Sequence, residues 1–389
     1  MNTLQLATQY QVGMLEGKYI TNEHIVKVLK TLNDTFKISI CGKSVKQKPI
    51  YAVRFGTGSK KVLMWSQMHG NEPTTTKGLF DFFNLLNTDS IIAEQIASKY
   101  TLLCIPILNP DGAEAYTRVN ANEIDLNRDA STITQPESKV LRDLLETFKP
   151  DLCFNLHDQR TIFGTEGTGL PATISFLAPA YNEEREYNAT RLAAISLINK
   201  MNAVLKNYIP NQIGRFDDAF NVNFTGDYIT SIGIPTILFE AGHFQNDYNR
   251  EESRKYVFIA LLTALVDFEE NEVDRKQNDE QELENYLRIP QNSKYFYDFI
   301  YRNIKTIANN DEKLITFAAQ FEENLVDGDI QFVAKIVAVD KLDEFKGHIE
   351  IDGKAMSFSA EYGNFPEISK KADFYLNNML KFINGLQFL

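Results

Sequence analysis

Residues 60–86, KKVLMWSQMHGNEPTTTKGLFDFFNLL, decide the fold. They begin with a short apolar run, Lys61–Gln67, which is typical of a strand buried on both faces. A helix is predicted for Pro73–Leu86, because a proline suits the first helical turn. His69 and Glu72 lie between the two elements, where a turn can aim an imidazole and a carboxylate at one metal ion. The alternative for this motif is a helix cap beside a surface histidine.

Strands and helices alternate outward from this stretch, over about residues 36–270. The strand candidates are mostly short apolar runs: Phe36–Cys41, Ile50–Phe55, Lys61–Gln67, Thr101–Leu108, Asp151–Leu156, Thr173–Ala178 and Pro235–Glu240. The helix candidates lie between them: Pro73–Leu86, Pro136–Phe148, Arg185–Asn207 and Arg250–Phe268. This order predicts a three-layer α/β/α fold with a mixed, mostly parallel central sheet.

The composition changes near residue 267, and this change suggests a domain organisation. Asp267–Tyr286 is dominated by charged and amide side chains, which indicates a solvated helix or a linker. A helix is expected for Ser293–Ala308, strands for Ile330–Val339 and His348–Ile351, and a last helix for Ser369–Phe382. We therefore predict a catalytic domain at 1–270, a charged linker and helical segment at 271–309, and a small C-terminal α+β domain at 310–389.

The overall charge argues against two classes of partner. The chain has 389 residues and a formal net charge of −12. An acidic chain repels a phosphate backbone, which disfavours a general nucleic-acid binder. No run of about 18 apolar residues occurs, so no membrane span is predicted.

The cysteines and the first residues bear on location. Cys41, Cys104 and Cys153 are scattered and predict neither a disulfide framework nor a cysteine zinc site. Residues 1–20 lack the basic and then apolar pattern of a secretory signal. We expect a reduced, cytoplasmic protein. The alternative is a secreted protein whose signal has been removed.

A second histidine and a glutamate each end an apolar strand. His157 follows Phe154-Asn155-Leu156, and Glu240 follows Pro235–Phe239. Strand ends in open α/β sheets line the ligand crevice, so these side chains can converge with the histidine of the first turn. Two histidines and one glutamate form a three-ligand zinc set with an open position. The alternatives are a buried core histidine and a glutamate paired with a helix N-terminus.

A polar loop follows the strand candidate Thr101–Leu108. It begins with the turn NPDG at residues 109–112 and contains Arg118, Asn127 and Arg128. Arginine binds carboxylates bidentately and stabilises a developing oxyanion. The alternative is a solvent-exposed loop with ordinary surface ion pairs.

Together these motifs resemble the zinc carboxypeptidases of the funnelin type, with relatives among the aspartoacylases and succinylglutamate desuccinylases. The resemblance rests on HGNE at 69–72, NPDG at 109–112, DLNR at 125–128, His157 and Glu240, in the family's order along the chain. It implies that His69, Glu72 and His157 bind one zinc ion. It also implies that Glu240 activates water and later protonates the leaving amine.

The resemblance also implies roles for the polar loop. Arg118 would polarise the scissile carbonyl and hold the oxyanion. Asn127 and Arg128 would grip the terminal carboxylate of the substrate. Asp125 would accept the free imidazole N–H of His69 and so fix its orientation.

Three functional hypotheses remain. The leading one is a zinc metallopeptidase that removes a C-terminal residue with a free carboxylate. The second is a zinc deacylase of small N-acyl amino acids or cell-wall peptides, which an appendage capping the cleft would favour. The third is a binding module without catalysis, and Glu240 argues against it. Asp217 and Asp218 are candidates for pairing with a basic substrate side chain, although a capped surface loop is the favoured interpretation.

Overall fold

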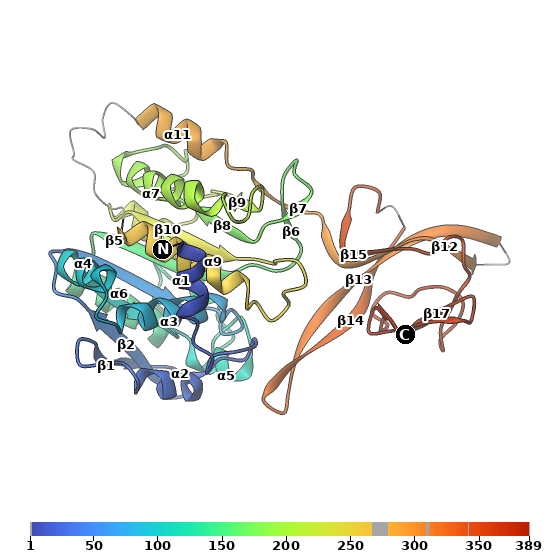
Figure 1. Ribbon diagram of the computed structural model, residues 1–389, viewed down its shortest axis with the longest axis horizontal. Coiled ribbons are helices and arrows are strands. Elements are labelled where there is room, and N and C mark those ends of the chain that lie inside the picture. Colours follow the sequence, from blue (N-terminus) through green and yellow to red (C-terminus); the bar gives the residue numbers. More distant parts are fainter. Residues whose placement is uncertain (1, 267–278, 309–310, 341, 389) are drawn as a thin grey trace. The chain divides into compact units, whose positions relative to one another are not determined.

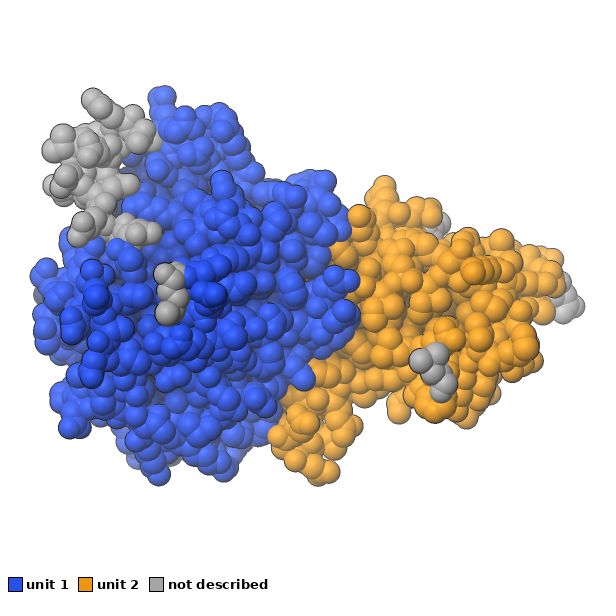
Figure 2. All heavy atoms as spheres, viewed as in Figure 1, with its two compact units in different colours: residues 1–159, 165–292 blue, residues 160–164, 293–389 orange. Residues whose placement is uncertain are grey.

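The computed structural model describes residues 2–266, 279–308, 311–340 and 342–388. They form two compact units (Figure 2). The larger unit comprises residues 1–159 and 165–292, and the C-terminal unit comprises residues 160–164 and 293–389. The domain boundaries expected at residues 270 and 309 stay predictions, because contacts define compact units and not independently folding domains.

Eight strands form the central sheet of the larger unit: β1 (Lys37–Lys43), β2 (Pro49–Phe55), β3 (Lys60–Ser66), β4 (Tyr100–Ile105), β5 (Leu152–Asp158), β8 (Ile174–Leu177), β9 (Ile213–Arg215) and β10 (Thr236–Ala241). Their order is β1-β2-β4-β3-β5-β10-β8-β9. Figure 1 shows the ribbon, with β1, β2, β5, β8, β9 and β10 of this sheet labelled. The adjacent strands β4, β3, β5 and β10 run parallel, whereas β1, β2 and β8 form antiparallel pairings. All seven strands predicted between residues 36 and 270 lie in this sheet, which confirms the mixed, mostly parallel α/β fold.

The larger unit also contains eleven described helical segments: α1 (Thr3–Gln9), α2 (Asn22–Leu29), α3 (Thr74–Leu86), α4 (Ile91–Lys99), α5 (Pro110–Ala115), the 3-10 helix η1 (Leu126–Arg128), α6 (Pro136–Phe148), α7 (Ala189–Leu205), α8 (Thr225–Ser231), α9 (Ser253–Val266) and α11 (Asp279–Leu287). Residues 267–278, which begin the charged stretch and include the start of the predicted linker, lie outside the described residues. None of the helices described is long and apolar enough to cross a bilayer.

Helices cover both faces of the sheet. Along β3, Val62 and Met64 belong to one hydrophobic cluster, whereas Leu63 and Trp65 belong to another. Side chains of α1, α2, α3, α4, α7 and α9 complete the first cluster, and side chains of α6 and α8 complete the second. Strands buried on both faces explain the continuous apolar runs in the sequence.

The C-terminal unit is built from strands. One four-stranded sheet has the order β14-β13-β12-β15, and a second has the order β16-β17-β18-β19. Their bounds are β12 (Phe296–Ala308), β13 (Asp311–Val326), β14 (Asp329–Val339), β15 (Lys346–Asp352), β16 (Phe358–Ser359), β17 (Phe374–Leu376), β18 (Leu380–Ile383) and β19 (Leu386–Gln387). Three short strands lie outside these sheets and the central one: β6 (Phe163–Thr165), β7 (Leu170–Pro171) and β11 (Asn292–Lys294).

Two helix predictions for this unit are wrong. Ser293–Ala308 contains β12, and Ser369–Phe382 contains β17 and most of β18. Among the described residues of the unit none is helical. The α+β appendage expected from the sequence is therefore an all-β unit over the residues described.

Candidate metal centre and active site

The turn between β3 and α3 carries two of the predicted metal ligands. The NPDG residues 109–112 are predicted as a turn, but in the structure they are the N-cap and the first residues of helix α5. They support the metal-binding turn, since Asn109 donates its backbone N–H to the carbonyl oxygen of Gln67 over 3.0 Å. A Cβ atom added at Gly70 would lie 1.9 Å from the carbonyl carbon of Gly112. The metal-binding turn and the start of α5 therefore pack backbone against backbone, and this contact fixes where the metal-binding turn lies.

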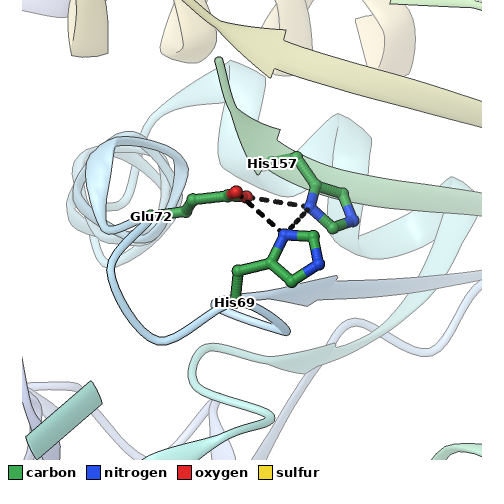
Figure 3. A group of neighbouring side chains, drawn as sticks. All are labelled: His69, Glu72 and His157. Carbon is green, nitrogen blue, oxygen red and sulfur yellow. Dashed lines mark hydrogen bonds and ion pairs between the residues drawn. The ribbon is translucent and has the colours of Figure 1, made fainter. Parts of the chain in front are cut away.

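His69, Glu72 and His157 bring three possible ligand atoms together (Figure 3). Nδ1 of His69 lies 2.8 Å from Oε1 of Glu72, and Nδ1 of His157 lies 2.9 Å from Oε2 of Glu72. The two Nδ1 atoms are 3.1 Å apart. All three side chains are buried. His157 reaches the cluster from β5, whereas the other two come from the turn before α3.

Asp125 determines which nitrogen of His69 faces the cluster. Its Oδ1 lies 2.9 Å from Nε2 of His69, so a neutral imidazole carries its proton there and presents the Nδ1 lone pair to Glu72. Two acceptors at hydrogen-bond distance need a cation or a proton between them. Two imidazole nitrogens and one carboxylate also form the donor set of catalytic zinc sites. The residues present therefore fit one zinc ion.

The electrostatics of the cluster favour positive charge. Burial acts to lower the pKa of His69, but the charge of Glu72 and the contact with Asp125 outweigh it, so that pKa is raised. Burial acts to raise the pKa of Glu72, but the two histidines outweigh it and hold that pKa well below its usual range. The pKa of His157 is lowered, with burial as the largest cause. A buried carboxylate that stays ionised between two imidazoles suits a bound cation.

Glu240 lies at the same edge of the sheet as His157. The two residues are register partners in the parallel strands β10 and β5. The Glu240 side chain is half-buried. Burial raises its pKa well above the usual value, and the charges of Glu72 and Asp158 add to this effect, whereas Arg118 opposes it. A carboxyl group with a raised pKa is suited to taking up a proton.

Arg118 also reaches the cluster. Its Nη1 donates to Oε1 of Glu72 over 3.2 Å, and its Nε donates to Oδ2 of Asp125 over 3.1 Å. The side chain is 47% exposed, so a molecule entering from solvent can contact the guanidinium. The structure thus brings together all six of the residues that the sequence analysis assigned to metal binding, catalysis and the support of His69.

Asn127 and Arg128 lie on η1, directly after Asp125. Oδ1 of Asn127 accepts the backbone N–H of Thr225 over 3.1 Å. The guanidinium of Arg128 stacks on the ring of Phe224, with its carbon 3.8 Å from the ring centre. The charge of Arg128 contributes to the lowered pKa of Asp125, so it acts close to the metal cluster. Both residues are therefore held against the start of α8.

Asp158 has a clear structural task that the sequence analysis did not identify. It accepts the backbone N–H groups of Thr74 and Thr75 over 2.8 and 3.2 Å. Its own N–H donates to Oε2 of Glu72 over 3.2 Å. The signal was available, because α3 begins at Thr74 behind a proline, which has no side-chain acceptor for a cap.

Asp217 and Asp218 are occupied within the protein. Oδ2 of Asp218 lies 2.5 Å from Nη2 of the buried Arg191, and its Oδ1 lies 3.4 Å from Nη1 of Arg185. Oδ1 of Asp217 accepts the backbone N–H of Ala219. These contacts match the favoured interpretation of a capped loop and give no support to a pocket for basic side chains.

The fold and the cluster together define an α/β/α unit with a candidate metal site at one edge of its sheet. Residues 22–141 match the family model described as zinc carboxypeptidase. The resemblance to zinc carboxypeptidases that the motifs indicate is therefore confirmed.

Curated relatives of this chain are carboxypeptidases. The probable carboxypeptidase 2 of Trichophyton verrucosum is 28% identical over 102 residues, which is 26% of this chain and 20% of the relative. Carboxypeptidase SOL1 of Arabidopsis thaliana is 25% identical over 162 residues, which is 36% of this chain and 33% of the relative. The chain thus spans between a fifth and a third of the length of these relatives.

Solved structures share the fold. The metallo-carboxypeptidase from Burkholderia cenocepacia has a TM-score of 0.52 at 18% identity, covering 64% of this chain and 69% of its own. The metallo-carboxypeptidase from Pseudomonas aeruginosa has a TM-score of 0.51 at 16% identity, covering 66% of this chain and 70% of its own. At these identities the likeness establishes the fold alone.

Proposed function

We propose that the protein is a zinc-dependent metallopeptidase that hydrolyses the amide bond of a C-terminal residue bearing a free carboxylate. The convergence of His69, Glu72 and His157 beside Glu240 carries this proposal. Three ligand atoms within 4.8 Å of one another suit one zinc ion, and a carboxyl group outside the ligand set, next to His157 in the sheet, supports the assignment of a base. The family match supports the same chemistry.

In this mechanism each side chain has one task. His69, Glu72 and His157 would hold the zinc ion, which would supply Lewis acidity and make water a stronger nucleophile at neutral pH. Glu240 takes the proton from the attacking water and gives it to the leaving amine nitrogen as the C–N bond breaks. Arg118 stabilises the negative charge that develops on the carbonyl oxygen.

Asn127 and Arg128 are proposed to hold the substrate's terminal carboxylate. Arg128 is kept in place by Phe224 and by its bond to the carbonyl oxygen of Asn127, over 2.9 Å. The amide nitrogen of Asn127 can donate to a carboxylate, since Oδ1 is the atom that binds Thr225. A carboxylate held at a fixed distance from the metal restricts cleavage to the last residue of a peptide.

The test is Glu240→Gln, which removes the base and no metal ligand. We expect zinc affinity to stay within about threefold and turnover to fall by about 10²–10⁴. The matched control is Glu146→Gln, the same change on an exposed position of α6, which should leave both unchanged. Substrates are peptides with a free C-terminal carboxylate and the same peptides with a C-terminal amide.

The outcomes separate the three hypotheses. Zinc-dependent loss of C-terminal residues from the free peptides alone would support the proposal. Cleavage of N-acyl amino acids with no cleavage of peptides would replace it by a deacylase. Zinc binding without hydrolysis of either class would leave a binding module. Unchanged turnover in Glu240→Gln would refute the role of that residue.

We also infer a cytoplasmic location. Cys41, Cys104 and Cys153 are all free, and the last two are buried. Free thiols are typical of reducing compartments. Fractionation of cells that make the protein tests this inference, and recovery outside the cytoplasm would contradict it.

A further inference from the structure

Arg118 and Asp125 lie on one loop, and both reach the metal cluster. Arg118 contacts Glu72, and Asp125 contacts His69. Residues 118–125, here called the Arg118 loop, contain neither helix nor strand. The contact between Nε of Arg118 and Oδ2 of Asp125, 3.1 Å, closes the two ends of the loop. The positions of both side chains therefore depend on what holds the middle of the loop.

The side chain of Asn120 binds the middle of the Arg118 loop to its support. Its Oδ1 accepts the backbone N–H groups of Asn122 and Ile124 over 3.0 and 3.1 Å. Its Nδ2 donates to Oε1 of Gln135 over 2.8 Å and to Oε2 of Glu137 over 3.1 Å. The residue is 3% exposed. The whole hydrogen-bonding capacity of one buried amide is thus used, half on the loop and half on its support.

The support itself, Glu137, is held by buried contacts on two sides. Glu137 lies in the first turn of α6 and is fully buried. Its other oxygen accepts the backbone N–H of Val45 over 3.0 Å, in the turn between β1 and β2. Further along α6, Val140 and Leu141 pack into the hydrophobic cluster on this face of the sheet. Moving Glu137 would break the hydrogen bonds of Val45 and Asn120 to its carboxylate, which is costly for buried groups. Glu137 therefore anchors the loop.

We propose that Asn120 is a positioning residue of the metal site, which sets Arg118 and Asp125 by fastening their loop to Glu137. Its effect on Asp125 concerns metal binding, since Asp125 orients His69. Its effect on Arg118 rests on the proposed function, since Arg118 acts on the substrate carbonyl there. The two effects are measured separately.

Asn122 is a matched control from the same loop. It is also an asparagine, and its Nδ2 donates to the same atom, Oε1 of Gln135, over 2.9 Å. It differs in being exposed and in having no bond to Glu137. An aspartate at either position adds one charge to the loop, but only at position 120 does the new carboxylate face a buried carboxyl group.

The first experiment compares Asn120→Asp with Asn122→Asp. The shape of the side chain is retained at position 120, but the two donors of Nδ2 become an acceptor that faces two acceptors. We expect zinc affinity, measured by competition with a chelator, to fall about tenfold in Asn120→Asp and by less than about twofold in Asn122→Asp. We expect kcat to fall about tenfold in Asn120→Asp, with little change in KM, because Arg118 acts on charge that develops in the transition state.

The second experiment restores the bond with reversed polarity. In Asn120→Asp combined with Glu137→Gln, the new amide at position 137 can donate to the carboxylate at position 120. Its oxygen can still accept from Val45. We expect the double variant to recover at least half of the lost zinc affinity on a logarithmic scale. A general loss of stability would give no such recovery.

Three results would overturn the proposal. The first is zinc affinity in Asn120→Asp equal to that of Asn122→Asp. The second is a double variant no better than Asn120→Asp. The third is a drop in the melting temperature of the zinc-free protein with unchanged zinc affinity, which would indicate a purely structural residue. If the unaltered protein hydrolyses no peptide, the proposed function fails, and the zinc titrations still test Asn120.

Discussion

Asp125→Asn tests how much the orientation of one histidine contributes to the metal site. In the folded protein Oδ1 of Asp125 contacts Nε2 of His69 at 2.9 Å and accepts the backbone N–H of Asn127 at 2.9 Å. Oδ2 accepts from Nε of Arg118 at 3.1 Å. An asparagine has the same shape but one oxygen. The side-chain oxygen of the asparagine should keep the contacts with His69 and Asn127, because both of these groups donate. The amide nitrogen of the asparagine then faces Nε of Arg118, which is also a donor, so this contact is lost.

The magnitude follows from these contacts. A hydrogen bond to a charged partner contributes about 1.5–3 kcal/mol, and a neutral one about 0.5–1.5 kcal/mol. The difference of about 1–1.5 kcal/mol corresponds to about a tenfold weaker binding of zinc. Asp125→Ala removes the bond altogether, and its loss should approach about a hundredfold. The two substitutions should therefore form a graded series.

The assay is a competition titration with a fluorescent zinc chelator at fixed pH. Asp143→Asn, at an exposed position of α6, is the control for the loss of one negative charge. It should bind zinc as the unaltered protein does. The reasoning would be refuted if Asp125→Asn bound zinc within about twofold of the unaltered protein, or if Asp125→Ala bound it as well as Asp125→Asn.

Three further predictions concern the same unit. Gly70→Ala should weaken zinc binding at least about tenfold, because the added Cβ would lie 1.9 Å from the carbonyl carbon of Gly112. The control is Gly13→Ala, whose added Cβ meets nothing within 4 Å and should leave zinc binding unchanged. Equal zinc titration curves for the two variants would contradict this prediction. Zinc at about 100 times its dissociation constant should stabilise the protein by about 2.7 kcal/mol, seen as a higher melting temperature that chelation reverses and that His157→Ala should not show. Burial raises the pKa of Asp227 to about 7 from 3.8, so the folded protein keeps a proton that the unfolded chain has released, and this group's contribution to stability falls as pH rises from about 4 to about 7. Asp227→Asn should therefore lose less stability than the unaltered protein between about pH 5 and pH 8. The same fall in melting temperature over this pH range in both proteins would contradict the raised pKa of Asp227.

The sequence predicts the central sheet well, because its strands are buried on both faces. The first six residues of β5 are all buried, and successive residues enter different clusters, as Cys153 and Phe154 do. Such runs end where the chain leaves the core, and polar residues at those ends are conspicuous. His157 and Glu240 are visible in the sequence for this reason.

In the C-terminal unit, by contrast, the spacing of apolar residues predicts the wrong secondary structure. In β12, Phe296, Phe299, Ile300 and Ile304 have helical spacing, which favours a helix when read alone. The strand satisfies this spacing differently, since Phe299 and Tyr301 enter one cluster and Ile300 enters another. The turn between β17 and β18 contains Asn377 and Asn378 with φ of 51° and 56°, a conformation that asparagine accepts more readily than most residues. That asparagine pair was the available signal for a hairpin.

The residues of the candidate site also differ in how far the sequence predicts their positions. His69, His157 and Glu240 come from the ends of β3, β5 and β10, which are parallel neighbours in the sheet, so topology alone brings their side chains to one edge. Arg118 and Asp125 come from a loop, and no strand order determines where a loop lies. Their positions follow from individual buried bonds, such as that between Asn120 and Glu137, which join residues 17 positions apart. A motif can therefore name the residues of such a loop, but their geometry depends on partners that no local pattern reveals. For this reason substitutions at Asn120 and Glu137, to which the sequence analysis assigned no role, are the sharper test of how the site is held.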